Sequence, residues 1–368
     1  MSSKTPVVAV LFQAIDPPII NGVRKPRKPG GYQDSGADIA YSLQKRGIRV
    51  ITPNPTPSPS IQEGWCFPDT ENGIIDAVRQ GATHLWANTI LFSSHPLQVS
   101  GEIQKYAQGT IDVVGQPPSM VERFDDKALL NDRLRDLGRF TLPKSWILKE
   151  SDDIASFIQS IEKDEEATYP IVGKPVRGRG SHGVKVCYGS QDLQSHISSL
   201  FKESPLVMLE QFLAGEEATI TVMPPAPGKN GYTSFPPVER FNHDDGVAPY
   251  NGVVAVTRNS RVVSQEDMDQ DSSYGIAMRE CEQVVELIQA MAPIRIDIRR
   301  FKEGSRFALF DINMKPNMTG PGRPGREDQA SLSALAAAAV GWDYPALLGE
   351  MLKTARPLEE FREFRPVF

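Results

Sequence analysis

The sequence has few cysteines and histidines and no long apolar run. It contains 3 cysteines and 5 histidines in 368 residues. Cys66, Cys187 and Cys281 are far apart, and no CxxC pair or histidine lies at metal-ligand spacing, which argues against a disulfide framework, structural zinc and a zinc hydrolase. The apolar run at 7–12 is too short for a signal peptide or a membrane span. These features predict a cytoplasmic protein without a membrane segment.

An excess of basic residues is also missing. Lysine and arginine number 40 against 46 aspartates and glutamates, so the formal net charge is -6. A nucleic-acid-binding protein normally shows a basic face, so we expect small-molecule substrates and no nucleic acid. The chain is 40% hydrophobic and 23% charged, which is typical of a globular α/β protein of two or three domains.

The first part of the chain alternates between strand and helix patterns. A strand at 7–12, a helix at 34–46 and a strand at 48–52 are followed by the same pattern at 74–80 and 83–86. This alternation predicts a doubly wound α/β domain over residues 1–118. Because the pattern lapses near 115–123, we expect a new domain there, beginning with a helix from Arg123 to Leu137.

A basic loop at 23–31 separates the first strand from the first helix. It holds Arg24, Lys25, Arg27 and Lys28. Ligand sites of α/β folds lie at the carboxyl ends of strands, so this loop is a candidate site. A solvated loop without a ligand is the alternative.

A glycine-rich stretch over 169–187 reads as strand, loop and strand. Lys174 precedes glycines at 178, 180 and 183, and such a loop can fold its backbone N–H groups around phosphates. The glycines match the dinucleotide fingerprint by letter, but a strand follows them where that motif needs a helix. A P-loop is excluded because its lysine follows the glycines. The alternative is a hairpin in which the glycines only turn the chain.

Two neighbouring strands near the C-terminus carry acids. Residues 294–298 and 305–313 predict a hairpin, in which Arg295 and Asp297 share one face and Asp311 and Asn313 share a face of the partner strand. Two carboxylates and an amide oxygen suit Mg²⁺ completed by nucleotide phosphates. Unrelated outward-facing polar residues would be the alternative.

Together these segments resemble the ATP-grasp ligases, in particular the branch of D-alanine–D-alanine ligase-like enzymes. The resemblance runs from about Lys127 to the end of the chain and is weaker before it. The motifs that carry it are Asp126-Lys127, Pro170–Pro175, the loop to Gly183, Leu209–Leu213, Gly215–Glu217, Arg295–Asp297 and Asp311–Thr319. No single motif is specific, but their order and spacing are.

The resemblance implies three domains, in which the two lobes of an α+β ATP-grasp fold follow the first domain. The central lobe over 119–206 would carry a glycine-rich lid, and the lobe over 207–368 the metal site. Nucleotide contacts would be Lys127, Lys174, Gly180, Ser181, Glu210, Gln211, Phe212, Leu213, Glu217 and Phe310. Mg²⁺ or Mn²⁺ ligands would be Asp297, Asp311 and Asn313. Catalytic residues would be Arg295, as an oxyanion stabiliser, and Ser181. Substrate contacts would be Asp34, Asn317, Ser331 and Leu332.

The implied activity is an ADP-forming carboxylate–amine ligation. A substrate carboxylate would take the γ-phosphate of ATP, and an amine would then displace phosphate from the acyl phosphate, with amino acids as the expected substrates. The resemblance also suggests a homodimer. An ATP-binding regulatory protein and a small-molecule kinase on the same fold are the alternatives.

The substrate half departs from the family pattern. Asn317 stands where the family has glycine, residues 320–326 are inserted, and loop 241–252 lacks the usual tyrosine and lysine. We therefore do not expect literal D-alanyl-D-alanine synthesis.

Overall fold

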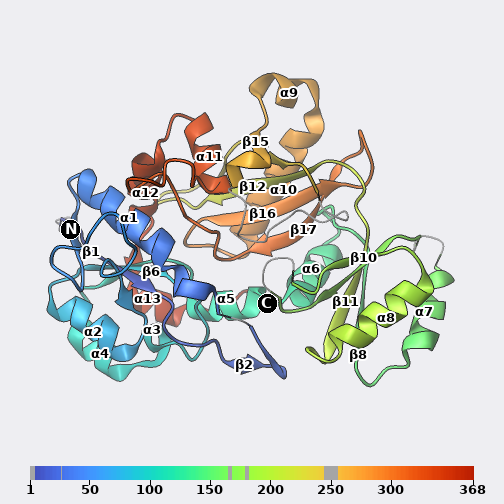
Figure 1. Ribbon diagram of the computed structural model, residues 1–368, viewed down its shortest axis with the longest axis horizontal. Helices are drawn as coiled ribbons and strands as arrows, with labels where there is room; N and C mark the ends of the chain where they lie inside the picture. Colours follow the sequence, from blue (N-terminus) through green and yellow to red (C-terminus); the bar gives the residue numbers. More distant parts are fainter. Residues whose placement is uncertain (1–4, 26, 165–167, 179–181, 244–255) are drawn as a thin grey trace.

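The computed structural model describes residues 5–25, 27–164, 168–178, 182–243 and 256–368. Within these ranges the strands form three larger sheets and one small hairpin. The first sheet and its helices lie at one end of the molecule, the second sheet at the other end, and the third sheet between them (Figure 1). The mixed α/β fold predicted from the sequence is confirmed.

The first sheet has the strand order β18–β7–β6–β1–β4, with β5 paired to β1. Strand β1 pairs in parallel with β4, β5 and β6, and β6 with β7, as expected for a doubly wound unit. The strands are β1 Val7–Phe12, β4 Arg49–Ile51, β5 Phe67–Pro68, β6 His84–Asn88 and β7 Asp112–Val114, with the hairpin β2 Ile19–Ile20 and β3 Val23–Arg24. The helices are η1 Pro29–Tyr32, α1 Gln33–Lys45, α2 Glu71–Arg79, α3 Pro96–Val99 and α4 Gly101–Ala107.

The end of the chain returns to this first sheet. Strand β18 (Arg356–Pro357) pairs antiparallel with β7, and helix α13 (Leu358–Glu363) follows it. Phe361 on α13 is fully buried in a core cluster that also contains Leu11 of β1. The predicted domain boundaries at 118 and 206 remain predictions, but the first sheet is completed by residues far outside 1–118.

The expected single helix over 123–137 is wrong. Two helices form instead, α5 (Pro118–Phe124) and α6 (Lys127–Asp136). Asp126 adopts extended backbone angles between them, and its carboxylate accepts a hydrogen bond from the Leu129 amide at 3.1 Å. An aspartate that binds its own backbone in this way starts a new helix rather than continuing one.

The second sheet is antiparallel, in the order β10–β9–β11–β8. It consists of β8 Ser145–Lys149, β9 Ile171–Pro175, β10 Lys185–Cys187 and β11 Leu206–Gln211, with helices α7 Ile154–Glu162 and α8 Ser190–Leu200. Residues of both helices and all four strands form one buried cluster. The predicted order of strand, loop and strand is confirmed by the antiparallel pairing of β9 with β10.

The third sheet has the order β15–β14–β12–β16–β17, with β13 paired to β12. Its strands are β12 Glu217–Met223, β13 Thr233–Ser234, β14 Val238–Arg240, β15 Ser260–Val262, β16 Ile294–Arg300 and β17 Phe307–Asn313. The accompanying helices are η2 Val256–Arg258, α9 Gln265–Gln270, α10 Ser272–Leu287, α11 Leu332–Ala339 and α12 Tyr344–Leu352.

The core is shared between the parts of the molecule. One buried cluster joins Leu85 of the first sheet, Leu130 of α6 and Ile296 of the third sheet, so these elements pack against each other. No helix in the described ranges has both the length and the apolar character to cross a bilayer. The three cysteines are buried free thiols, and burial raises the pKa of Cys187 to about 11.

Candidate active site

The hairpin of β16 and β17 holds the acids that the sequence placed together. In its antiparallel register Asp297 lies opposite Asp311, and Arg295 lies opposite Asn313. The register shifts after Asp297, since Ile298 pairs with Leu309, so Phe310 is the extra residue of a β-bulge. The bulge leaves both Phe310 and Asp311 half-buried, which puts an aromatic ring beside the acids.

Asp297 is the most heavily hydrogen-bonded of these acids. Its Oδ1 accepts from Thr219 Oγ1 at 2.7 Å, and the Arg295 guanidinium reaches both oxygens, at 3.1 and 3.2 Å. Asn313 Nδ2 donates to Oδ2 at 3.2 Å. The contacts fix the carboxylate on the face that β12, β16 and β17 share.

Asp311 is paired with Lys127, the first residue of α6. Burial opposes ionisation of Asp311, but the Lys127 ammonium, together with Lys174 and Arg295, outweighs it and lowers the pKa of this carboxyl. Burial likewise opposes the charge on Lys127, whose pKa Asp311 nevertheless raises. Three cations from three different elements therefore act on one carboxylate.

Lys174 lies on β9 and faces β11. Its Nζ is 2.6 Å from Glu210 Oε2, and both side chains are buried. The Phe310 ring centroid is 5.9 Å from the same nitrogen. In the described part of the chain the other oxygen of Glu210, Oε1, is buried without a hydrogen-bond partner. Buried acceptors are normally hydrogen-bonded, so a bound ligand could supply the donor that this oxygen lacks.

The segment after Glu210 connects the second and third sheets. Gln211 exchanges hydrogen bonds with Lys144, at 2.9 Å through its amide nitrogen and 3.4 Å through its side chain. Phe212 packs under the Arg299 guanidinium at 5.1 Å, and Leu213 is buried. Residues 210–213 thus line the junction at which the resemblance expects adenine.

Glu217, the expected ribose contact, begins β12. Its Oε2 lies 3.6 Å from Arg299 Nη1 and 2.8 Å from His243 Nε2. Arg299 is directly opposite Glu217 in the β12–β16 register. Arg299 is therefore placed on the neighbouring strand to orient the Glu217 carboxylate.

Part of the predicted lid lies outside the residues that the structure describes. Gly180 and Ser181 lie outside the described residues, as does most of loop 241–252. Next to the lid, Arg177 contacts Asp126 at 3.3 Å, which connects the end of β9 to the start of α6.

Three of the expected substrate contacts follow β17. Asn317 Nδ2 donates to Thr319 Oγ1 at 3.0 Å, while its Oδ1 is buried without a partner among the described residues. Ser331 caps α11 by accepting from the Ala334 amide at 3.3 Å. Leu332 is the first residue of that helix and is buried.

Asp34, the fourth, lies on α1 beside cations. Lys28 Nζ is 3.3 Å from its carboxylate, and Arg326 Nη2 is 4.0 Å away. Its pKa is lowered: burial opposes ionisation, but the charge of Lys28 outweighs it. The basic loop is paired elsewhere too, since Lys25 contacts Asp125 at 2.7 Å and Arg27 contacts Asp16 at 3.8 Å.

Several site residues were not predicted. Thr219 and Arg299 contact predicted residues directly, and His243 and Lys315 lie at the edge of the site. Thr219 shares a strand face with Glu217 by the period of two, and Lys315 continues the spacing of Asp311 and Asn313. This period-two spacing could have identified Thr219 and Lys315 as residues of the site. Nothing local in the sequence indicated the pairing of His243 or Arg299 with Glu217.

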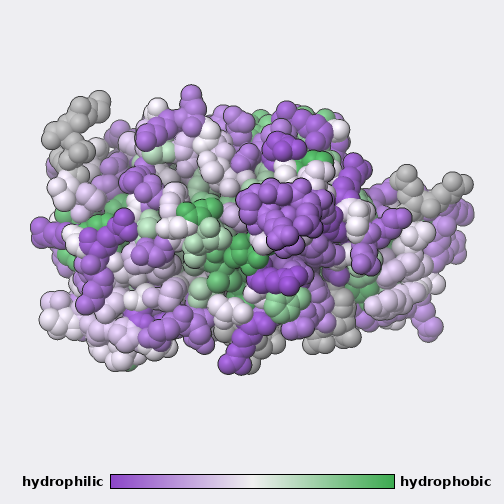
Figure 2. Space-filling model, turned by 90° about the horizontal axis from the view of Figure 1, so that it is seen from above, coloured by the Kyte–Doolittle hydropathy of each residue, from purple (hydrophilic) through white to green (hydrophobic). Residues whose placement is uncertain are grey.

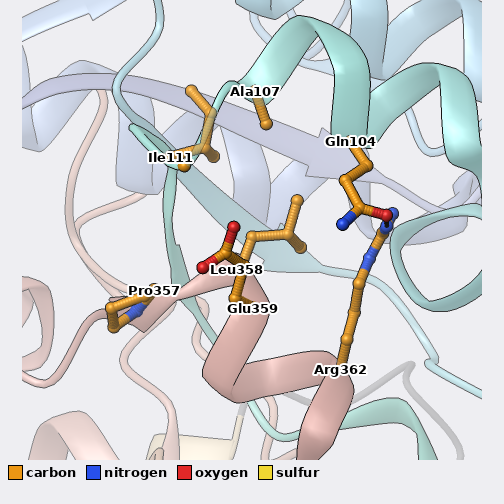
Figure 3. Close-up of a pocket in the computed structure, with 8 residues that line it drawn as sticks. Gln104, Ala107, Ile111, Pro357, Leu358, Glu359 and Arg362 are labelled. Carbon is orange, nitrogen blue, oxygen red and sulfur yellow. Dashed lines mark hydrogen bonds between the residues drawn. The ribbon is translucent and has the colours of Figure 1, made fainter.

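A separate pocket lies between α4 and the C-terminal segment. It is lined by Gln104, Ala107, Gly109, Ile111, Pro357, Leu358, Glu359 and Arg362 (Figure 3). The close-up shows Arg362 of α13 beside Gln104 of α4, whose Oε1 accepts from it at 3.2 Å. The pocket shares no residue with the acid cluster. Seen from above, polar residues cover much of the surface around an apolar area near its middle (Figure 2).

Comparison with known proteins gives a consistent family. The family model described as the D-Ala D-Ala ligase C-terminus matches residues 142–353. The chain is 25% identical over 187 residues to the D-alanine–D-alanine ligase of Syntrophotalea carbinolica, covering 51% of this chain and 54% of that protein, or about half its length. It is 25% identical over 254 residues to D-alanine–D-alanine ligase A of Bacillus cereus, covering 67% and 75%. The structure of the Bacillus anthracis ligase complexed with ATP superposes with a TM-score of 0.63 at 16% identity, covering 95% of this chain and 97% of that one. The predicted ATP-grasp fold is confirmed.

Proposed function

Since the chain belongs to the D-alanine–D-alanine ligase family, we propose that it is an ATP-dependent, ADP-forming ligase that joins a carboxylate to an amine. The observation that carries the proposal is the ion pair of Lys127 with Asp311, which lies opposite Asp297 and its partner Arg295 on the neighbouring strand. Phosphoryl transfer is catalysed chiefly by positioning and charge neutralisation, and this cluster offers both. Amino acids are the proposed substrates because the relatives are named for them.

ATP is the proposed nucleotide. Lys127 and Lys174 would hold its phosphates, and residues 210–213 its base. The buried, unpartnered Oε1 of Glu210 supports this assignment, because it needs a donor such as an exocyclic amine. Glu217 would accept from ribose hydroxyls, with Arg299 fixing its orientation.

The donor set fits a hard divalent cation. Among the described residues no three His, Cys, Asp or Glu side chains lie close enough together to hold a metal ion by themselves. The candidate ligands are instead two carboxylates, Asp297 and Asp311, and the side-chain amide of Asn313. Asp297, Asp311 and Asn313 would hold Mg²⁺ or Mn²⁺, which would neutralise phosphate charge and is commonly completed by phosphate oxygens and water. The pairing of Asp311 with Lys127 supports this assignment, because the carboxylate already lies against a positive charge.

The remaining chemistry belongs to residues of the chain. Arg295 is held by Asp297 at 3.1 Å, where a guanidinium would stabilise the oxyanion of a tetrahedral intermediate. The two substrates react in sequence: the acid's carboxylate oxygen bonds to the γ-phosphorus and releases ADP, and the amine nitrogen then bonds to the acyl carbon and releases phosphate. Ser331 and Leu332 at the start of α11 would bind the amine's own carboxylate. Cytoplasmic location and a homodimer remain predictions.

A coupled ADP-release assay tests the proposal. We would screen D- and L-amino acids singly and in pairs and analyse active mixtures by mass spectrometry for a product lighter than the sum of the pair by one water. We expect Lys174→Ala to lower the rate at least a hundredfold, by analogy with the loss of one oxyanion donor. Lys185→Ala is the matched control, because Lys185 lies on the same hairpin but pairs with Asp192 at the surface.

Two other results of the ADP-release assay would contradict the ligase proposal. ADP release with one substrate and no amine would identify a kinase instead. ATP binding without turnover on any acid and amine would favour a regulatory protein. Since Lys174→Ala leaves Glu210 buried without its cation, the pair Lys174→Met with Glu210→Gln separates loss of folding from loss of chemistry.

A further inference from the structure

Asn317 links the two halves of the proposed reaction. It follows β17, which ends at Asn313 of the proposed metal site. Its Nδ2 donates to Thr319 Oγ1 at 3.0 Å, and the Thr319 carbonyl accepts from the Ser331 amide at 3.0 Å. These contacts lead from the acid cluster to the start of α11, where the amine's own carboxylate would bind. Asn317 therefore stands on the path between the phosphate site and the amine site.

The side chain of Asn317 is held at one end only. Thr319 is buried and fixes the Nδ2 end. The other end, Oδ1, is buried and accepts no hydrogen bond in the part of the chain that the structure describes. An amide oxygen can accept two hydrogen bonds, and a buried acceptor that has none is costly. Oδ1 is therefore ready to accept from an N–H or O–H group of a ligand.

The second half of the reaction brings such a donor to this path. The phosphate and acyl oxygens of an acyl phosphate are acceptors, so they cannot pair with Oδ1. The amine carries N–H groups, and it would approach from α11 because Ser331 and Leu332 would hold its carboxylate. If the acid substrate is itself an amino acid, its ammonium is a second donor. A test must therefore measure the two half-reactions separately.

We propose that Asn317 Oδ1 accepts a hydrogen bond from the attacking amine and directs its lone pair toward the acyl carbon. This inference rests on the proposed function, which supplies the acyl phosphate. The lone pair of the neutral amine bonds to the acyl carbon, and the bond from that carbon to the phosphate oxygen breaks. Its electron pair leaves with the phosphate, which takes the proton that the nitrogen loses and departs as HPO₄²⁻. An amide oxygen is too weak a base to take that proton, so Asn317 orients the nucleophile.

The test compares acyl phosphate formation with amide formation. The amino acids of the ADP-release screen are first given singly, with ATP and saturating hydroxylamine, which traps the acyl phosphate as a hydroxamate. They are then given as pairs without hydroxylamine. Asn317→Leu keeps the shape and lacks the acceptor, so we expect kcat/KM for the amine to fall at least roughly tenfold and hydroxamate formation to stay unchanged. Asn72→Leu, at an exposed asparagine of α2, should change neither rate.

Two further variants test the direction of the hydrogen bond and the contribution of Thr319. Asn317→Asp keeps an acceptor, so it should retain most of the ratio of amide to hydroxamate rates that Asn317→Leu loses. Thr319→Val releases Nδ2, so it should lower this ratio in the wild type and have no further effect in Asn317→Leu.

Three results would overturn the inference while the ligase stands. These are an unchanged ratio in Asn317→Leu, an equal loss of both half-reactions in that variant, and a ratio in Asn317→Asp as low as in Asn317→Leu. A wild-type protein that releases no ADP with any acid would instead overturn the proposed function, and this inference with it.

Discussion

Lys127, Lys174 and Arg295 come from α6, β9 and β16 and all act on Asp311. Each cation is separated from the others by long stretches of sequence, so no local pattern could show that they converge. The period-two spacing of Arg295, Asp297, Asp311 and Asn313 predicted the acid face correctly, because strand geometry alone sets which side chains share a face. The position of Phe310 escaped that rule, since a bulge shifts the register by one residue.

The lowered pKa of Asp311 makes a prediction about acid stability. A carboxyl whose folded pKa lies below the unfolded value of 3.8 stabilises the fold at higher pH, and this contribution is lost as the pH falls through the folded pKa. We expect Asp311→Asn to be less stable than the wild type at pH 6, and the difference between their urea midpoints to shrink below about pH 3.8.

The same variant also tests catalysis. Asp311→Asn should lower ADP release at least a hundredfold at pH 7, because the proposed cation site loses a charge. Asp16→Asn, which removes an exposed acid, should change neither the pH dependence nor the rate. A constant stability difference from pH 6 to pH 3 would show that Asp311 does not carry the linkage.

At the scale of elements, strands and hairpins were predicted better than helix ends. The β9–β10 and β16–β17 hairpins follow from alternating residues with glycine or charged residues between them. The break between α5 and α6 was missed because Asp125 and Asp126 also suit a first helical turn, and the pattern alone does not distinguish an acid inside that turn from one that caps it.

The cap at Asp126 gives an element-scale prediction. Asp126→Ala removes the acceptor for the Leu129 amide and the partner of Arg177. We expect it to destabilise the protein by about 1 kcal/mol and to raise the KM for ATP, because Lys127 is the next residue. Urea unfolding and ADP-release kinetics would measure the two effects.

Asp153→Ala is the control for this cap. Asp153 caps α7 with the same geometry, accepting from the Ser156 amide at 3.2 Å, on a helix outside the proposed site. It should cost a similar free energy of about 1 kcal/mol and leave the KM for ATP unchanged. Equal kinetic effects of the two variants would mean that α6 does not position Lys127.

At the scale of the whole molecule, segments from the C-terminal part of the chain contact the first domain at places that no local sequence pattern indicates. Strand β18 has only two residues, Arg356 and Pro357, so no periodicity could predict that it completes the first sheet. Residues 320–326, which are predicted from the sequence to be an insertion, also cross between the parts of the molecule. Gly322 packs where a Cβ would lie 2.8 Å from the Asp38 carbonyl oxygen, so a larger residue would push the insertion away from α1.

A buried ion cluster fastens this insertion to the first domain. Asp38 on α1 is fully buried, and its carboxylate accepts from Arg323 Nε at 2.8 Å and from Arg326 Nε at 2.9 Å. Asp38→Asn would leave the buried Arg323 without its counter-ion, which typically costs about 3–5 kcal/mol. We expect a correspondingly lower urea midpoint for the variant. We also expect residues 320–326 to pack less tightly against α1.

Two comparisons test whether the lost stability of Asp38→Asn comes from the unpaired charge of Arg323 or from a general loss of packing. Glu350→Gln breaks the surface pair with Lys353 and should change stability by less than about 1 kcal/mol. Replacing the whole cluster, with Asp38→Leu, Arg323→Met and Arg326→Met together, should recover most of the stability lost in Asp38→Asn, because no buried charge is then unpaired. If the triple variant is as unstable as Asp38→Asn, shape rather than charge balance holds the insertion on α1.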